Sequence, residues 1–479
     1  MPTKIDYIRQ NEFSFNFGRP FKFSGFQTIA GDKATTPING SYNIDDKAIP
    51  LLSGIPVDPL LADWLDIALA VYLADRLSPR DNPNNQHSGV RSRDVRLQIP
   101  VRELSVWVQP NVCASLHNVL GFFTEDGWHL DFIPYEGKKR SSETQGMLFA
   151  PPPTLPVRVA LFSGGLDSFA GAIQQLSEFP EHSFIFVSGV TNNRQRAAQH
   201  NQIAAIKNTR HHVHHIPISY KLTQSYTKRR EEISQRSRGF LFLTLGGVTA
   251  ITANSKELYL YENGIGAINL PYNASQVGTS NTRAVNPRSL LLMEEFITNL
   301  LGISFKIHNP FLFQTKAEMC RYPMIKSFGR SIAQTFSCDG FPIRQKNKPQ
   351  CGSCTSCLLR RYALQSAGLT TFDASDTYLR DLLSPGFAGN TNHLFGLQAM
   401  EWQVQVITSC LKSQNPWFDL SQKFTELQTI SVKLWLSTGR PLVDIVDIQQ
   451  DFLRLYTQYV TEWHEFSAHK LLITQLQAA

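Results

Sequence analysis

Six residues, Ser163-Gly164-Gly165-Leu166-Asp167-Ser168, separate an apolar run, VRVALF, from a helical pattern. Two adjacent glycines allow a tight turn whose N–H groups point inward, and the helix that follows adds its positive N-terminal end. The spacing therefore predicts a cradle for a phosphate-like anion. The chain has neither a Walker A lysine motif nor a G-x-G-x-x-G fingerprint here, so we do not expect the phosphate grip of kinases and GTPases. A plain turn with Asp or Ser as helix cap is the simpler alternative.

Four cysteines fall in one short window with the spacing C-x12-C-x2-C-x2-C, namely Cys338, Cys351, Cys354 and Cys357. Short C-x2-C steps let thiolates converge on one tetrahedral ion, and four sulfurs saturate zinc. The spacing predicts a closed, structural Zn²⁺ site. An iron–sulfur cluster and four unligated thiols are the alternatives.

Basic residues are concentrated in the same window. From Arg330 to Arg361 there are six basic residues and only Asp339 as an acid, which accounts for +5 of the net charge of +7. A zinc ion with four thiolates is itself negative, so we expect these cations to offset the zinc site and a nearby nucleotide.

Five further residues are candidates for ligand binding. Glu262 and Asn263 follow an apolar run and offer hydrogen bonds to a purine-like edge, although an Asn-Gly turn is an equal alternative. Arg238 precedes an apolar helix, where a guanidinium can bind phosphate through two hydrogen bonds. Arg283 and Lys316 can offset carboxylate or phosphate charge, or form surface ion pairs instead.

The elements that carry these residues alternate between strand and helix. Apolar runs starting at Val157, Phe184, Val213, Glu257 and Phe305 are separated by helical segments. This alternation predicts an α/β fold, a doubly wound parallel sheet with right-handed crossovers. Ligands of such sheets bind at the carboxyl ends of the strands, where the glycine loop and Glu262 should lie.

Three parts are predicted along the chain. Residues 1–150 mix extended segments with an amphipathic helix from Leu60 to Leu77, which indicates an α+β accessory domain. The proline-rich stretch from Pro151 to Pro156 marks a linker. Residues 151–385 then form the catalytic domain with the zinc site, and residues 386–479 form a helical region.

Composition excludes several classes of protein. The chain has 479 residues, 42% of them hydrophobic, with 46 Lys plus Arg, 39 Asp plus Glu and seven Cys. These values fit a packed globular protein and not a disordered chain or a disulfide scaffold. We expect a cytoplasmic protein with reduced thiols, with no membrane partner and, given the mild charge, no nucleic-acid partner.

The segment SGGLDS after a first strand resembles the PP-loop of the ATP pyrophosphatases, a family with an adenine nucleotide α-hydrolase-like fold. The resemblance implies that Ser163, Gly164, Gly165 and Ser168 hold pyrophosphate while Asp167 organises Mg²⁺. We take Asp167, Ser168 and Lys316 as the catalytic candidates. The candidates for binding ATP are the loop including Leu166, together with Arg238, Glu262, Asn263 and Arg283.

Three more segments resemble one branch of that family, the QueC or 7-cyano-7-deazaguanine synthase proteins. They are the late cysteine motif CGSCTSCLLRR from Cys351 to Arg361, NPFLFQTKAEM from Asn309 to Met319, and RSRGFLFLTL from Arg236 to Leu245. The resemblance covers about residues 155–370 and implies a 7-deazaguanine substrate with ATP, Mg²⁺ and Zn²⁺.

The chain also departs from the biosynthetic enzymes. Its first cysteine spacer is longer, the segment from Ser280 to Pro287 (SNTRAVNP) replaces an expected Asp-x-Arg-Pro-Glu, and both ends are extended. With ADRL near Leu77, this architecture is more similar to QueC-like proteins of the bacterial antiphage systems Qat and type IV CBASS. That resemblance implies a protein partner from the same operon, whose amine receives the activated carboxylate as an amide.

We therefore expect an ATP-dependent C–N ligase that adenylates a 7-deazaguanine carboxylate, releases pyrophosphate and transfers the acyl group to an amine. Three alternatives remain open. They are a nitrile-forming 7-cyano-7-deazaguanine synthase that uses ammonia, a tRNA-modifying PP-loop enzyme, and a non-catalytic, nucleotide-binding defence scaffold.

Overall fold

The computed structural model describes most of the chain, namely residues 11–18, 22–29, 35–79, 93–145, 155–210, 212–224, 231–232, 234, 236–272, 283–340, 348–382, 391–438 and 444–478. Several predicted features lie outside these residues. They are most of the linker at 151–156, the first part of the segment at 280–287, and Arg344 and Lys346 of the basic window.

Five parallel strands confirm the predicted α/β fold. They are β6 (Val157–Leu161), β7 (Ser183–Val190), β8 (Val213–Gln224), β9 (Glu257–Tyr259) and β10 (Lys306–His308). Their order across the sheet is β10-β9-β6-β7-β8, with parallel pairing throughout. Strand β6 therefore lies between β7 and β9, and the order reverses on its two sides. In a doubly wound sheet this reversal marks the crevice where ligands bind.

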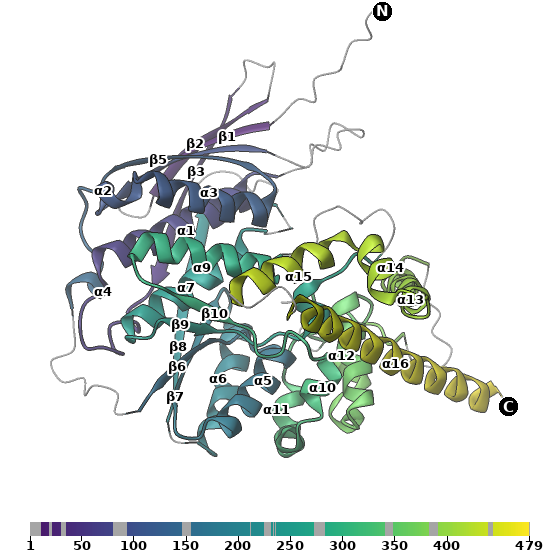
Figure 1. Ribbon diagram of the computed structural model, residues 1–479. Helices are drawn as coiled ribbons and strands as arrows, with labels where there is room; N and C mark the ends of the chain where they lie inside the picture. The colour runs from purple at the N-terminus through teal and green to yellow at the C-terminus, as the bar shows by residue number, and fades with distance from the viewer. Residues whose placement is uncertain are drawn as a thin grey trace, which may run out of the picture.

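Helices cover both faces of these strands (Figure 1). Helices α5 (Leu166–Glu178) and α6 (Asn193–Lys207) lie on one face, where Phe169 of α5 packs in one core with Phe162 and Phe186. Helices α7 (Arg238–Thr252) and α9 (Pro287–Leu301) lie on the other face, where α7 packs on β6 and β7 and α9 packs on β10. The predicted helix-strand alternation thus produces two distinct cores.

The N-terminal strands continue the same sheet. Strand β3 (Thr35–Asp45) pairs antiparallel with β8, and β2 (Lys22–Ile29), β1 (Asn11–Gly18), β4 (Asp94–Val101) and β5 (Gly127–Pro134) follow in that order. One hydrophobic core contains Phe13 and Phe15 of β1 together with Val159 of β6. The predicted division near residue 150 thus separates two parts of one ten-stranded sheet.

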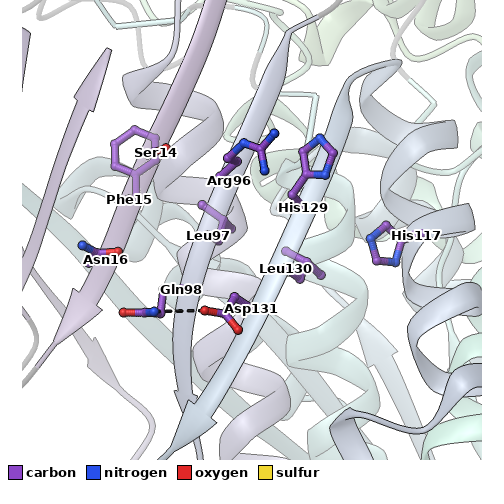
Figure 2. Close-up of a pocket in the computed structure, with 10 residues that line it drawn as sticks. All are labelled: Ser14, Phe15, Asn16, Arg96, Leu97, Gln98, His117, His129, Leu130 and Asp131. Carbon is purple, nitrogen blue, oxygen red and sulfur yellow. Dashed lines mark hydrogen bonds between the residues drawn. The ribbon is translucent and has the colours of Figure 1, made fainter. Parts of the chain in front are cut away.

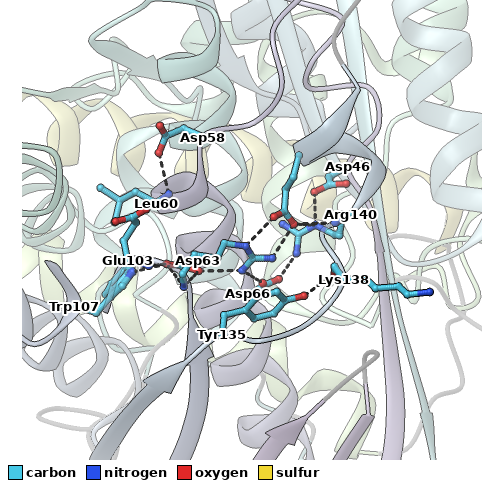
Figure 3. A network of polar contacts seen from close by, with 12 residues as sticks. Asp46, Asp58, Leu60, Asp63, Asp66, Glu103, Trp107, Tyr135, Lys138 and Arg140 are labelled. Carbon is cyan, nitrogen blue, oxygen red and sulfur yellow. Dashed lines mark hydrogen bonds and ion pairs between the residues drawn. The ribbon is translucent and has the colours of Figure 1, made fainter. Parts of the chain in front are cut away.

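Helix α1 (Pro59–Leu77) is buried on nearly all sides, which corrects the expectation of an amphipathic helix. Figure 3 shows its acidic residues Asp63 and Asp66 within a network of polar contacts. The Nη1 atom of Arg102 lies 2.9 and 2.7 Å from their carboxylate oxygens. Glu143 of α4 (Ser141–Thr144) completes the pairing of Arg102 at 2.7 Å, and Arg140 pairs with Asp46 at 3.0 Å. Paired charges can be buried where lone ones cannot, and this explains how a helix with three acids fills a core.

The third acid of α1 joins the N-terminal part to the parallel strands. Asp75 is fully buried, pairs with Arg93 at 2.6 Å and accepts hydrogen bonds from Ser237 N at 3.0 Å and Ser237 Oγ at 2.7 Å. Ser237 is the N-cap of α7. Asp75, within the ADRL segment, therefore fixes the start of α7. The other helices of this part are α2 (Leu104–Trp107) and α3 (Pro110–Thr124), and α3 packs on α9.

Helices α8 (Gly264–Ile268), α10 (Lys316–Cys320), α11 (Gly329–Ala333) and α12 (Thr355–Ser366) belong to the part predicted as the catalytic domain. The C-terminal part, predicted as helical over residues 386–479, is helical in the residues that the structure describes. Helices α13 (Thr391–Leu411), α14 (Pro416–Lys423), α15 (Thr425–Thr438) and α16 (Ile445–Ala478) then gather beside α12, away from β1 and β2 (Figure 1). None of the helices in the described ranges combines the length and the apolar character needed to cross a membrane.

Candidate functional site

The glycine loop connects β6 to α5 at the reversal point of the sheet. Gly164 has φ +82°, a conformation that favours glycine, and Gly165 is the N-cap of α5. A Cβ on Gly165 would lie 3.0 Å from the carbonyl oxygen of Phe336, so a side chain there would crowd the neighbouring backbone. Gly164 is thus favoured by its backbone conformation, and Gly165 by the close approach of the Phe336 backbone.

Two serines brace the loop from within. Ser163 Oγ accepts a hydrogen bond from Gly165 N at 3.1 Å, and Ser168 Oγ donates to Gly165 O at 3.0 Å. The two hydroxyl oxygens are 3.1 Å apart. Ser163 is exposed while Ser168 is buried, so the loop presents one hydroxyl to solvent at the end of a 13-residue helix. This arrangement suits an anion.

Asp167 is the centre of a buried polar cluster. One of its carboxylate oxygens accepts a hydrogen bond from Asn263 Nδ2 at 3.0 Å, and the other accepts one from Lys316 Nζ. The exposed fractions are 7% for Asp167, 5% for Lys316 and zero for Asn263. The structure therefore brings together three predicted residues that lie up to 149 positions apart in the sequence.

Glu262 completes the cluster. Asn263 Nδ2 also donates to Glu262 Oε1 at 2.9 Å, while Asn263 Oδ1 accepts from Gly266 N at 3.0 Å and caps α8. Both amide hydrogens of Asn263 are thus directed at carboxylates. Burial, with the neighbouring charge of Asp167, raises the pKa of Glu262 to about 8. Burial disfavours the Lys316 cation, but Asp167 and Glu262 together raise the pKa of Lys316 above its ordinary value.

Asn309 is a site residue that we did not single out. Its Nδ2 donates to Glu262 O at 2.8 Å and its Oδ1 accepts from Glu262 N at 3.3 Å, so its side chain clamps the backbone of Glu262. Asn309 is the first residue of the segment NPFLFQTKAEM that also carries Lys316. The segment therefore contributes two residues to the site, Asn309 and Lys316.

Arg238 and Arg283 lie away from this cluster. Arg283 pairs with Glu125 at 2.9 Å and donates to Phe122 O at 3.0 Å, both at the end of α3. The Arg238 guanidinium lies over the ring of Phe242, with Cζ 4.9 Å from its centroid. Their roles in binding ATP remain predictions.

The four cysteines converge as their spacing predicts. All four Sγ atoms lie within 4.8 Å of one another, and those of Cys351 and Cys357 are 3.9 Å apart. Tetrahedral Zn–S bonds of about 2.3 Å require sulfurs about 3.8 Å apart. Backbone N–H groups of Cys351 and Cys354 lie 3.4 and 3.2 Å from the sulfurs of Cys338 and Cys351. The donor set fits one zinc ion.

The basic window needs a correction. Arg360 pairs with Asp373 at 3.2 Å, and Arg361 pairs with Asp381 and, at 3.6 Å, with Asp373. Asp373 and Asp381 lie after the basic segment at residues 330–361, so they were not included in its charge. Their carboxylates, and not the cysteine sulfurs, offset the two guanidinium groups.

Two buried glutamines of α6 also hold the loop. Gln199 Nε2 donates to Ser163 O and Gln202 Nε2 donates to Gly164 O, each at 3.1 Å. Both residues have no exposed surface. No motif identifies these glutamines in the sequence. The one feature that could have indicated them is that they lie at positions i and i+3 on the helix next to the loop.

Helix α16 reaches the residue that precedes Lys316. Thr315 Oγ1 accepts from Glu318 N and donates to Glu462 Oε1, each at 3.1 Å. Glu462 is fully buried and also accepts from Arg321 at 2.7 Å and Gln458 at 2.9 Å. The C-terminal part thereby helps to fix the start of α10 and hence Lys316.

A hollow of about 460 Å³ lies elsewhere, on the open face of β1, β4 and β5 (Figure 2). Polar side chains, including Arg96, Gln98, His129 and Asp131, project from these strands. The residues lining it include none of the predicted site residues, which places it apart from the glycine loop.

Comparison with known families agrees with the geometry. Residues 157–368 match the model of the family described as queuosine biosynthesis protein QueC. This part of the chain is QueC-like. Among curated proteins, none matches the chain. The QueC-like part has the PP-loop fold and begins at β6, so the match includes the loop, Asp167, Glu262, Lys316 and all four cysteines. It suggests an ATP-using enzyme of the ATP pyrophosphatase type that acts on 7-deazaguanine-like substrates, with ATP and Mg²⁺.

Proposed function

We propose that this protein is an ATP-dependent ligase for a 7-deazaguanine carboxylate, 7-carboxy-7-deazaguanine. A carboxylate oxygen attacks the α-phosphorus of ATP, the bond to the β,γ-phosphates breaks, and pyrophosphate leaves. An amine nitrogen then attacks the carbonyl carbon of the acyl-adenylate. The bond to AMP breaks, the amine loses a proton, and an amide forms. Activation replaces a poor hydroxide leaving group by a phosphate.

The observation that carries the proposal is the Asp167–Lys316 pair at the foot of the glycine loop. Charge on the departing pyrophosphate grows during the first step. Preorganised N–H donors of the loop and a cation held in place by a buried carboxylate stabilise such charge without reorganising. Lys316 is such a cation because it is buried and pairs with Asp167, and Asn263 holds the carboxylates of Asp167 and Glu262 in place.

Magnesium fits the same cluster. Carboxylate oxygens are the protein ligands Mg²⁺ prefers, commonly one or two together with phosphate oxygens. Asp167 would hold the ion beside the loop, with Glu262 as the nearest second carboxylate. When bound, the ion would neutralise part of the negative charge on the phosphates.

The acceptor in this proposal is the N-terminal amine of a partner protein encoded in the same antiphage defence operon. Its support is that the chain has strands β1 to β5 and helices α13 to α16 outside the QueC-like residues, which provide surface for a macromolecule. With ammonia as acceptor the product would be a primary amide or, after a second activation, a nitrile.

Incubation of pure protein with ATP, Mg²⁺ and 7-carboxy-7-deazaguanine tests the first step. We expect release of pyrophosphate and, when an amine is present, AMP in equal amount. The Asp167→Asn protein is the matched control and should release neither. If wild-type protein releases no pyrophosphate, with or without candidate partners, the proposed activity is wrong. Mass spectrometry of the co-expressed partner then distinguishes a protein-linked amide from a small-molecule product.

A further inference from the structure

A backbone segment that leads to the first cysteine ligand lies directly on the glycine loop. Phe336 N donates to Gly164 O at 3.3 Å, and Phe336 O is the atom that a Cβ on Gly165 would approach at 3.0 Å. Phe336 is only two residues before Cys338. The loop and the four-cysteine site are thus joined by one short stretch of chain.

Gln202 ties this stretch to the loop. Its Nε2 donates to Gly164 O at 3.1 Å and to Gln334 O at 3.4 Å, so one amide group bridges both backbones. Both partners are carbonyl oxygens, which only accept hydrogen bonds, and this fixes the NH₂ side of the amide toward them. Gln202 is fully buried, so water does not replace these contacts at low cost.

The other end of the stretch is fixed at the cysteine site. Ser337 N donates to Gln350 Oε1 at 3.4 Å, and Cys351 N donates to Cys338 Sγ at 3.4 Å. A metal bound by Cys338 and its three partners would therefore hold residues 334–338 at one end, while Gln202 and Gly164 hold them at the other. Release of the metal frees one end, and the support on the back of the loop weakens.

We propose that Gln202 is a positioning residue that couples metal occupancy of the four-cysteine site to the shape of the Ser163–Ser168 loop. The coupling makes nucleotide affinity depend on the metal and, because binding linkage is reciprocal, metal retention depend on the nucleotide. The dependence of nucleotide affinity on the metal rests on the proposed function. The dependence of the loop's shape on the metal does not, because the contacts that carry it join Gln202 and Phe336 to the loop and involve no nucleotide.

Hydrogen–deuterium exchange on the full-length protein tests, without any nucleotide, whether the metal affects the Ser163–Ser168 loop. We expect that stripping zinc from the wild-type protein speeds exchange in peptides covering residues 162–168, as well as in those covering the cysteines. In Gln202→Leu, exchange of the loop should already be fast and change little on stripping. If stripping changes the cysteine peptides and leaves the loop unchanged, the coupling is wrong.

The variants have a matched control on the same helix. Gln202→Glu replaces the donor with an acceptor facing two carbonyls, so it should loosen the loop at least as much as Gln202→Leu. Gln195 is buried about two turns earlier on the same helix, and its Oε1 only accepts, from Thr191 N and Oγ1. Gln195→Glu keeps that acceptor and should leave loop exchange unchanged. Exchange in β4 and β5 reports whether each variant is folded.

Zinc release to a chromogenic chelator tests whether nucleotide binding and metal binding are coupled. In the wild-type protein, we expect ATP to slow zinc release, and zinc to tighten ATP binding, both by about ten-fold if the loop contacts contribute as buried hydrogen bonds do. In Gln202→Leu, ATP should no longer slow zinc release, and zinc should no longer tighten ATP binding. ATP that binds the wild-type protein without affecting zinc release contradicts the coupling. ATP that does not bind at all contradicts the proposed function instead, and the exchange experiment then decides the coupling alone.

Discussion

Lys316 and Asp167 form an ion pair in which both side chains are more than nine-tenths buried, at the point where α5 and α10 begin. Asn263 occupies the second oxygen of Asp167, so each residue of the pair is held by its neighbours. Such a pair gives a cation a fixed position in a site with little water. Each partner depends on the other for its stability in the folded protein.

Asp167→Asn should abolish pyrophosphate release and also destabilise the protein, because Lys316 remains as a buried cation without its partner. Breaking a buried pair in this way costs about 3–5 kcal/mol. Asp167→Asn combined with Lys316→Met removes both charges and should recover most of the unfolding free energy, measured by denaturant titration, but no activity. A single variant as stable as the wild type would show that the pair is unimportant to the fold.

Glu262 predicts an unusual dependence of stability on pH. Its pKa is raised from 4.5 to about 8, so the folded protein binds this proton more tightly than the unfolded chain. The stabilisation is fully present below about pH 4.5 and is lost as the pH rises through 8. Without nucleotide or added magnesium, Glu262→Gln should therefore melt at a higher temperature than the wild type at pH 8.5, with a smaller difference at pH 5. Glu295→Gln, on an exposed position of α9, should show no such trend. A difference that does not vary with pH would contradict the raised pKa.

Glu462 predicts that the C-terminal helix affects turnover. Glu462→Ala removes the acceptor for Thr315 and Arg321, so the start of α10 and the Lys316 ammonium lose their support. Misplacement of a catalytic group by about 1 Å lowers rates by roughly 100-fold, so we expect kcat to fall 10- to 100-fold while ATP affinity changes much less. Glu465→Ala, exposed on the same helix, is the control. A fall in ATP affinity with unchanged kcat would assign Glu462 a different role.

The cysteine site predicts one zinc ion per chain and a colourless protein. Elemental analysis and the visible absorption spectrum measure both. Cys354→Ser should lose the metal and melt at a lower temperature, because metal binding by four thiolates contributes directly to folding. A brown protein that contains iron and sulfide would instead support the tRNA-modifying alternative. The four Sγ atoms lie within 4.8 Å of one another, and this short spacing favours a single zinc ion over an iron–sulfur cluster.

The sequence predicted the parts of the site that are carried by local patterns. The strand, two glycines and helix at 157–178 specify the loop, because glycine and helix polarity act within a few residues. Glu262 and Asn263 were predictable because the carboxyl ends of parallel strands share one edge. Cys338 and its partners were predictable because short spacers bring thiolates to one ion.

The remaining features depend on contacts that no local pattern encodes. The pairing of β3 with β8 joins residues about 180 positions apart, and extended segments near the N-terminus fit equally well in a separate domain. Gln202 and Glu462 resemble ordinary helical polar residues until the chain places a loop or a threonine opposite them. The burial of Asp63, Asp66 and Asp75 likewise depends on arginines from other segments.

The position of β8 in the sheet limits how copies of this protein can associate. Strand edges with unpaired N–H and C=O groups are the surfaces through which two sheets join into one. If the parallel strands stood alone, β8 would be such an edge, but here β3 covers it through pairs such as Ile44 with Tyr220. Among the strands that the structure describes, β10 and β5 lie at the ends of the sheet. At β10, Glu294 Oε1 already accepts from Ile307 N at 2.8 Å. Any dimer built by extending the sheet must therefore displace this carboxylate or join through β5, more than half a sheet away from the glycine loop.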